Sequence, residues 1–300
     1  MRSMTDISQQ AASRFIEAMV HDQSLALMQF LSRVTRRLGV AEHAYVVGGA
    51  VRNFLMVPPR PIKDIDVVFD AVAAGHDSEW LANKVADAIP ARTRVLADQY
   101  GVSKVFVLSS WELAGHEMMD PDQAAVEIAN ARKESYGGAE GKGYKPEVEP
   151  ATIEEDVYRR EFSFNTLMWR LSELAHGPEK AEIIDLTGCG RLDLEQGVMR
   201  CPSDPDKTFS DDPTRMLRAI KFLIKYGFKI PPDVAASIRR NAHKLKRMPW
   251  ESVGNILVNN ILNEPSYKKA LKEMEGLGLL EAVSDILREK KPFAAFLGRQ

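Results

Sequence analysis

The sequence predicts an α+β protein, with a mixed α/β front half and an all-helical back half. Two observations carry this prediction. Short apolar or β-branched runs that end in turn residues recur through the first half of the chain. After Ser210 such runs are scarce, and apolar residues instead recur at helical spacing. A chain of 300 residues allows about two domains.

The front half is expected to alternate helices and strands. Residues 8–39 carry apolar side chains at helical spacing and predict two helices. A helix over 51–57 would follow the Gly48-Gly49 turn and stop at Pro58-Pro59. The remaining expected elements are a helix over 79–89 and strands over 44–47, 65–69, 93–96, 104–108 and 125–129.

The middle of the chain changes character. Residues 136–144 (YGGAEGKGY) are rich in glycine and are expected to form a mobile loop. Thr152 and Glu155 form a capping-box pattern that opens a helix, and a second helix is expected to run to about Leu174. Short extended pieces are expected at 183–184 and 198–199, and further helices over 213–226, 232–240, 253–262 and 267–274.

The composition excludes several classes of protein. It is 45% hydrophobic and 27% charged, which is unlike disordered, collagen-like or multi-span membrane chains. The two cysteines exclude a disulfide scaffold and a cysteine-rich zinc module. We see no signal peptide and no apolar run long enough to span a membrane, and the six scattered histidines have no metal-ligand spacing. A cytoplasmic protein is therefore expected.

The net charge of −2 hides an asymmetry along the chain. Residues 1–150 carry 16 basic and 20 acidic side chains, whereas residues 151–300 carry 24 and 22. From Lys207 to Arg247 there are 11 Lys or Arg side chains and three acids, a local excess of +8. Such a window attracts polyanions, although solvated helix faces produce similar runs.

The segment from Tyr45 to Asp70 is the most informative part of the sequence. Asp64 and Asp66 would point to one side of a strand, where their charges repel unless a cation lies between them. A lone pair with this spacing also occurs at exposed strand starts. Gly48-Gly49, followed by Arg52, would place bare backbone amides and a helix start nearby. A phosphate cradle beside two carboxylates suits the chemistry of Mg²⁺ and a nucleoside triphosphate.

This segment resembles the head domain of class II tRNA nucleotidyltransferases and bacterial poly(A) polymerases, within the polymerase-β-like nucleotidyltransferase superfamily. The family motifs GGxVRD and DxD stand here as residues 48–53 and 64–66, with Asn53 in place of Asp. The resemblance implies that Asp64 and Asp66 are catalytic and bind Mg²⁺, or Mn²⁺ in its place. It also implies that Gly48, Gly49 and Arg52 hold the triphosphate.

Further motifs follow in the family's order. RRDFTINAL stands as residues 159–167, with Glu161 for Asp, which implies that Arg160 and Asn165 bind the nucleotide. Alone, Arg159-Arg160 would be a helix-surface pair. Residues 185–194 resemble the DxxGGxxDL turn, where we favour a structural role for the glycines. The last motif is weak, because Ser252 stands where the family has Arg.

Residues 209–222 resemble the family segment F-x-EDPLRMLRAIRF. Asp212 and Arg215 share one helix face, and the resemblance implies that this pair selects the nucleobase; a surface ion pair is the simpler alternative. The basic side chains that follow on this helix suit contact with an RNA backbone. They are Arg218, Lys221 and Lys225.

Residues 126–136 match a family stretch that leads into a flexible loop. Glu127 lies on an expected strand within it. Either it is a third carboxylate of the metal site or it pairs with an arginine in the cleft.

The resemblance therefore predicts a template-independent RNA 3′-terminal nucleotidyltransferase that adds C and A to tRNA from CTP and ATP and releases pyrophosphate. A poly(A) polymerase, or an enzyme that adds only CC or A, carries the same motifs. A non-catalytic RNA-binding relative would be expected to have lost the carboxylate pair. The expected partner is tRNA or another RNA 3′ end. No DNA or membrane partner is expected, and the sequence does not define the oligomeric state.

Four regions are expected on this basis. They are a helical N-terminal extension (1–40), the nucleotidyltransferase head (41–206), a helical neck for base selection and RNA contact (207–265) and a truncated helical body (266–300). Family members usually continue into body and tail domains. We therefore expect this chain to be short for the family and its grip on RNA to depend on the basic neck.

Overall fold

The structure is a computed structural model that describes residues 24–62, 64–89, 93–107, 112–113, 116–117, 124–136 and 146–289. The expected loop at 137–144 and the expected helical segment at 8–23 lie outside the described residues. Contacts between Cα atoms divide the chain into two units. Unit 1 comprises residues 1–133, 149–157 and 165–188, and unit 2 comprises residues 134–148, 158–164 and 189–300.

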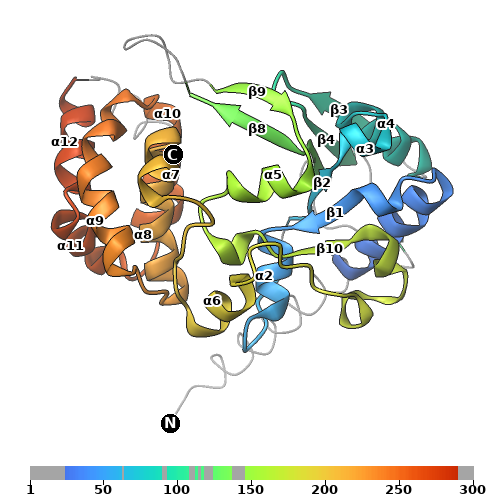
Figure 1. Ribbon diagram of the computed structural model, residues 1–300, viewed down its shortest axis with the longest axis horizontal. Coiled ribbons are helices and arrows are strands. Elements are labelled where there is room, and N and C mark those ends of the chain that lie inside the picture. The colour runs from blue at the N-terminus through green and yellow to red at the C-terminus, as the bar shows by residue number, and fades with distance from the viewer. Residues whose placement is uncertain are drawn as a thin grey trace. The chain divides into compact units, whose positions relative to one another are not determined.

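Unit 1 is built on a six-stranded mixed sheet (Figure 1). Strands β2 and β7 are parallel, and the other neighbouring strands are antiparallel. Val46, Val67 and Ile128 are buried in its central strands. In spatial order the strands are β10 (Met168–Arg170), β1 (Ala44–Val47), β2 (Asp66–Phe69), β7 (Ala124–Asn130), β4 (Val102–Val107) and β3 (Thr93–Ala97).

Helices of unit 1 surround this sheet. Helix α4 contacts β3, β4 and β7 and begins at an N-cap, where the side chain of Asp77 accepts a hydrogen bond from the Trp80 amide. The α-helices are residues 24–37, α2 (Gly49–Leu55), α3 (Ala71–Ala74), α4 (Ser78–Ala88) and α5 (Ile153–Tyr158), which ends at the unit boundary. The 3₁₀ helices are η1 (Ala41–His43), η3 (Leu171–His176) and η4 (Pro178–Lys180), with η2 (Ser163–Asn165) across the boundary.

The predicted mixed α/β front half is confirmed, and the predicted strands of the sheet are present with ends shifted by about two residues. The capping box is also confirmed. The Thr152 amide donates to the Glu155 carboxylate over 3.1 Å, and the Glu155 amide donates to the Thr152 hydroxyl over 3.4 Å.

The predicted second helix to Leu174 is wrong. Instead, Met168–Arg170 form strand β10, which pairs with β1. Met168 and Trp169 are almost fully buried, and Trp169 packs edge-on against Phe54. Sheet pairing and burial of this apolar segment therefore override its local helical pattern.

Unit 2 is largely helical, as predicted, and its helices occupy the yellow to red part of the ribbon (Figure 1). Helix α8 contacts α10 and α11, and it ends at Gly227, which has the left-handed conformation. The helices are α6 (Gly190–Gln196), α7 (Pro205–Asp211), α8 (Thr214–Tyr226), α9 (Pro232–Asn241), η5 (Ala242–Arg247), α10 (Trp250–Leu257), the π-helical η6 (Val258–Leu262), α11 (Tyr267–Gly276) and α12 (Leu279–Glu289).

An aromatic cluster forms much of the core of unit 2. Phe164 packs edge-on against Phe222 and Phe228, with ring centroids 5.1 and 4.9 Å apart. Phe162 joins them, and the four rings are at most 5% exposed. The cluster therefore ties residues 158–164 to the helices that follow residue 189.

Two small sheets complete the described structure. They are the pairs β5 (Glu112–Leu113) with β6 (His116–Glu117) and β8 (Arg132–Ser135) with β9 (Glu147–Pro150). None of the helices in the described part of the chain has the length and hydrophobicity needed to cross a membrane.

Candidate functional site

The acidic strand and the glycine turn meet in unit 1. Val47, the last residue of β1, is the register partner of Asp66, the first residue of β2. Gly48 follows with φ +73° and ψ −122°, which is a conformation that side chains strongly disfavour. A Cβ atom on Gly48 would lie 3.8 Å from Asp66 Oδ2. The structure therefore brings the predicted turn and the predicted carboxylate side by side.

The two carboxylates have the properties of ligands for a hard cation. Asp64 and Asp66 are both exposed, and their oxygen atoms suit Mg²⁺ or Mn²⁺. Among the residues that the structure describes, no group of three or more His, Cys, Asp or Glu side chains could hold a metal.

Glu127 lies beside Asp66 in the sheet, but its carboxylate forms a salt bridge with a lysine. Asp66 and Glu127 are register partners on β2 and β7. The Lys104 ammonium lies 2.7 Å from Glu127 Oε2. This hydrogen bond to Glu127, with the nearby charge of Asp66, raises the pKa of Lys104. A positive charge is thus held beside the acidic strand.

Arg52 is fixed inside unit 1 by two asparagines. It is 8% exposed, and its Nη1 donates to Asn165 Oδ1 over 2.7 Å. Its Nη2 and Nε donate to Asn53 Oδ1 over 2.9 and 3.2 Å. A Cβ atom on Gly49 would lie 3.7 Å from Nη2 of Arg52. Three predicted nucleotide-binding residues, Gly49, Arg52 and Asn165, are therefore close together.

Asn53 stands where the family has Asp. Both the oxygen and the nitrogen of its side-chain amide form hydrogen bonds. While Oδ1 accepts from Arg52, Nδ2 donates to the Pro61 carbonyl over 2.8 Å. An ionised aspartate at this position has no hydrogen to donate to Pro61. The departure from the motif is therefore accommodated by a local hydrogen bond to the segment that leads to Asp64.

The predicted base-selecting pair lies in unit 2, with Arg215 in the first turn of α8. Asp212 is not on that helix as expected, because it follows α7 in an extended conformation. Arg215 Nε is 3.8 Å from Asp212 Oδ2, and Arg215 Nη1 donates to the Thr208 carbonyl over 3.2 Å. Asp212 Oδ1 accepts hydrogen bonds from the amide and hydroxyl of Thr214, over 2.9 and 2.6 Å. Arg215 is 5% exposed, so the pair is not a surface ion pair.

A second ion pair of unit 2 joins the Arg-Arg motif to α8. Arg218 Nη1 lies 3.8 Å from Glu161 Oε1. Burial alone would raise the pKa of Glu161, but the charge of Arg218, with that of Arg160, holds it below its ordinary value. The charges of two residues with predicted phosphate or RNA roles, Arg160 and Arg218, thus both act on Glu161.

The basic stripe of α8 lies opposite its buried apolar side chains, as predicted. Met216, Ile220 and Leu223 are buried, whereas Lys225 is exposed and Lys221 is half-buried. The Lys225 ammonium lies 5.9 Å from the centre of the Tyr226 ring. The helix therefore separates buried apolar side chains from a basic face.

Sequence reasoning missed a buried carboxylate next to the base-selecting pair. Glu134 of β8 contacts Arg159, Arg215 and the hydroxyl of Tyr136. These residues are far apart in the sequence, and alternation on a strand alone gives no sign of such a cluster. The opposite charges in Arg132-Lys133-Glu134 were the only local signal.

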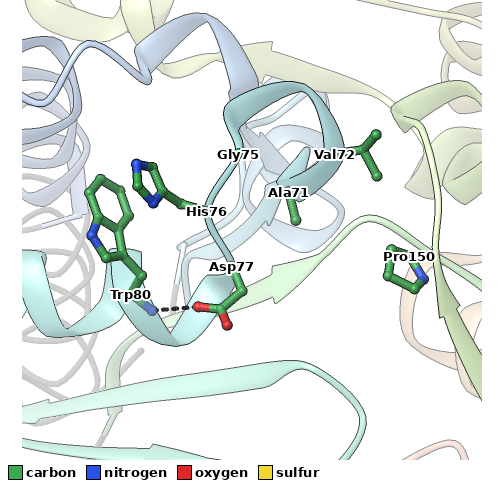
Figure 2. A pocket seen from close by; sticks show the side chains of 7 residues that line it. All are labelled: Ala71, Val72, Gly75, His76, Asp77, Trp80 and Pro150. Carbon is green, nitrogen blue, oxygen red and sulfur yellow. Dashed lines mark hydrogen bonds between the residues drawn. The ribbon is translucent and has the colours of Figure 1, made fainter.

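One surface hollow of unit 1 contains none of the predicted site residues (Figure 2). It has a volume of about 470 Å³. The imidazole of His76 stacks on the indole of Trp80, with ring centroids 3.8 Å apart. Its lining consists of Ala71, Val72, Gly75, His76, Asp77, Trp80 and Pro150.

The mixed sheet, with Asp66 beside a glycine turn, agrees with the nucleotidyltransferase head that the sequence motifs predict. The model of one family, described as the poly A polymerase head domain, matches residues 44–200, which is more than half of the chain. The chain belongs to this family.

The curated relatives include tRNA nucleotidyltransferases and poly(A) polymerases. The chain is 30% identical over 263 residues to the A-adding tRNA nucleotidyltransferase of Geobacter sulfurreducens, which covers 87% of the chain and 26% of the relative. It is 27% identical to the CCA-adding enzyme of Anoxybacillus flavithermus, covering 90% and 57%. It is 30% identical to poly(A) polymerase I of Salmonella typhi, covering 72% and 42%. The chain thus spans about a quarter to just over half of these relatives.

Solved structures support the same fold. A CCA-adding enzyme in its apo form II matches with a TM-score of 0.67 and 25% identity, covering 90% of this chain and 56% of the other. The Thermotoga maritima CCA-adding enzyme in complex with tRNA matches with a TM-score of 0.62 and 24% identity, covering 86% and 51%.

Proposed function

We propose that this chain carries the catalytic and base-selecting parts of a cytoplasmic, template-independent RNA 3′-terminal nucleotidyltransferase. Its substrates are CTP, ATP and the 3′ end of tRNA, and its products are the extended RNA and pyrophosphate. The observation that carries the proposal is the Asp66 carboxylate beside the Gly48 turn, two residues after Asp64, in a chain of this family. Relatives named as A-adding and CCA-adding enzymes support the choice of tRNA.

The reaction forms one bond and breaks one. The RNA 3′-oxygen attacks the α-phosphorus, the bond to the β-phosphate breaks, and the hydroxyl proton passes to solvent. Asp64 and Asp66 would hold Mg²⁺. The chemistry that this ion supplies is activation of the 3′-hydroxyl and neutralisation of charge on the leaving pyrophosphate.

The remaining steps belong to protein groups. The backbone at Gly48 and Gly49 leaves room for phosphate oxygens, and the guanidinium groups of Arg52 and Arg160 supply positive charge to the triphosphate. Asn165 holds Arg52 in place. In unit 2, Asp212 and Arg215 offer an acceptor and fixed donors that match the edge of cytosine or adenine.

The direct test offers each nucleotide separately to tRNA that ends before the first C, after C and after CC. We expect CTP to be used by the first two substrates and ATP by the third, with no reaction after chelation of the metal. Asp64→Asn or Asp66→Asn should lower incorporation about a hundredfold or more, because a bound metal contributes several kcal/mol to such a transition state.

Glu79→Gln is the matched control, since this exposed carboxylate lies on α4 of the same unit. Unchanged incorporation by the Asp64→Asn, Asp66→Asn double variant would refute the metal assignment. RNA binding without metal-dependent transfer would instead indicate a non-catalytic binding protein.

A poly(A) polymerase is the second candidate, because poly(A) polymerase I of Salmonella typhi matches this chain at 30% identity. Long A-tails on generic RNA, with no use of CTP, would select it. The assay above distinguishes the two activities.

A further inference from the structure

Glu134 is a buried carboxylate that holds three groups of unit 2. Its side chain is 6% exposed. Oε1 accepts a hydrogen bond from Arg159 Nη1 over 2.9 Å, and Oε2 accepts one from the Tyr136 hydroxyl over 2.6 Å. Arg215 Nη2 lies 3.6 Å from Oε2. Residues 136, 159 and 215 thus converge on one carboxyl group.

Each nitrogen of the Arg215 guanidinium faces an acceptor of the same unit. Nη1 donates to the Thr208 carbonyl, Nη2 forms the ion pair with Glu134, and Nε faces Asp212. A planar guanidinium that has an acceptor beside each of its three nitrogen atoms is restricted to one orientation. Of these acceptors, Glu134 is a buried charge that does not belong to the α7–α8 segment.

Removing the Glu134 carboxylate from water costs free energy, so stability alone does not explain why this charge is buried. Two opposite charges taken out of water contribute little net stability, and apolar side chains often serve as well. Hydrogen bonds from Arg159 and Tyr136 hold the Glu134 carboxylate in place, 3.6 Å from the Arg215 guanidinium. The Tyr136 hydroxyl remains a donor in this cluster, because burial and the charge of Glu134 raise the pKa of Tyr136.

We propose that Glu134 is a positioning residue that fixes the guanidinium of Arg215 and thereby sets which nucleobase is accepted. This inference rests on the proposed function, in which Asp212 and Arg215 face the base. Cytosine N3 and adenine N1 are hydrogen-bond acceptors, whereas uracil N3 and guanine N1 each carry a hydrogen. A guanidinium offers only donors. When the guanidinium cannot rotate, the N3 hydrogen of uracil or the N1 hydrogen of guanine would face one of its N–H groups. Two donors that face each other form no hydrogen bond, so these bases bind less well.

The inference predicts a loss of discrimination when Glu134 loses its charge. In Glu134→Gln, the preference for CTP over UTP, measured as the ratio of kcat/KM values on tRNA that lacks CCA, should fall about tenfold or more. Structural damage lowers the active fraction and scales both rates equally, so it leaves this ratio unchanged. The preference for ATP over GTP on tRNA ending in CC should fall in the same way.

Two further variants complete the experiment. Tyr136→Phe removes one hydroxyl that supports Glu134, and it should lower the preference about threefold without a large change in fold. Asp206→Asn is the matched control, because this half-buried carboxylate of α7 bonds to Arg240, Ser237 and Asn241 and not to Arg215. It should keep the wild-type preference.

The outcomes separate the two hypotheses. A wild-type protein that transfers no nucleotide refutes the proposed function and this inference with it. A selective wild-type protein whose preference is retained in both Glu134→Gln and Tyr136→Phe refutes the positioning role alone. If Glu134→Gln does not fold, Tyr136→Phe decides the question.

Discussion

At the scale of single residues, Gly48 shows how one backbone conformation serves the acidic strand. Its φ of +73° with ψ of −122° suits glycine, and its neighbour in space is the Asp66 carboxylate. Gly75 also has a positive φ, of +70°, but no other group lies within 4 Å of the place of a Cβ atom. The two glycines therefore share a backbone conformation but differ in their surroundings.

We expect Gly48→Ala to destabilise the fold by about 2 kcal/mol and to abolish most nucleotide transfer, because the turn beside Asp66 must shift. Gly75→Ala should cost about 1 kcal/mol and leave transfer intact. Thermal unfolding and CTP incorporation, measured together, check both. Equal activity of the two variants would contradict the role of the Gly48 turn.

The two cysteines should differ in reactivity. Cys201 is 8% exposed, and burial raises the pKa of its thiol to about 12, whereas Cys189 is half-buried. Because the thiolate is the reactive form, Cys201 should resist alkylation near neutral pH in the native protein. A thiol-specific reagent should label Cys189 first, and both thiols only in denaturant. Rapid native labelling of Cys201, identified by mass spectrometry, would be inconsistent with this burial.

At the scale of elements, helix α8 has an apolar face and a basic face on opposite sides. Its apolar side chains enter the core of unit 2, while Arg218, Lys221 and Lys225 extend along the polar face. The predicted amphipathic pattern is confirmed by burial. The RNA role of the three basic side chains remains a prediction.

The double variant Lys221→Ala, Lys225→Ala should weaken tRNA binding and reduce the slope of log K against log salt by about 1 to 2. The reason is that fewer counterions are released when fewer phosphates are neutralised. Lys268→Ala, Lys269→Ala on α11 is the matched control, since both lysines are exposed. Filter binding at several salt concentrations measures the slope, and identical slopes for all three proteins would exclude α8 from the RNA contact.

The elements also show what could be predicted from sequence. The capping box at Thr152 and the strand before Gly48 depend on neighbours in the chain, so local patterns indicate them. Strand β10 could not be predicted, because Met168–Arg170 become a strand only through pairing with β1. The cluster at Glu134 was missed for the same reason, since Arg159 and Arg215 reach it through tertiary structure.

At the scale of the whole molecule, the charge asymmetry along the sequence corresponds to different parts of the structure. The acidic front half supplies Asp64 and Asp66, and the window of +8 lies within unit 2. Charged side chains of unit 2 are also paired internally, as Glu161 is with Arg218. Such pairs make the stability of the fold depend on pH.

The pKa of Glu161 is lowered in the folded protein, so its ionised form stabilises the fold above the pKa of the unfolded chain, at about 4.3. This contribution is lost as the pH falls through the folded-state value. Glu161→Gln should therefore melt at a lower temperature than wild type near about pH 7, and the difference should close below about pH 4. Calorimetry across this range measures it. A difference that grows with acidification would have the wrong sign.

The aromatic cluster of unit 2 has a consequence for how this protein can be divided. Phe162 and Phe164 come from a short passage of chain between two passages of unit 1, yet they pack with Phe222 and Phe228. A gene fragment that begins at residue 189 would encode the helices without two of the four rings of their core. It would also lack Glu134. No single cut in the gene therefore releases unit 2 as a complete module, and swapping it between homologues requires three separate exchanges of sequence.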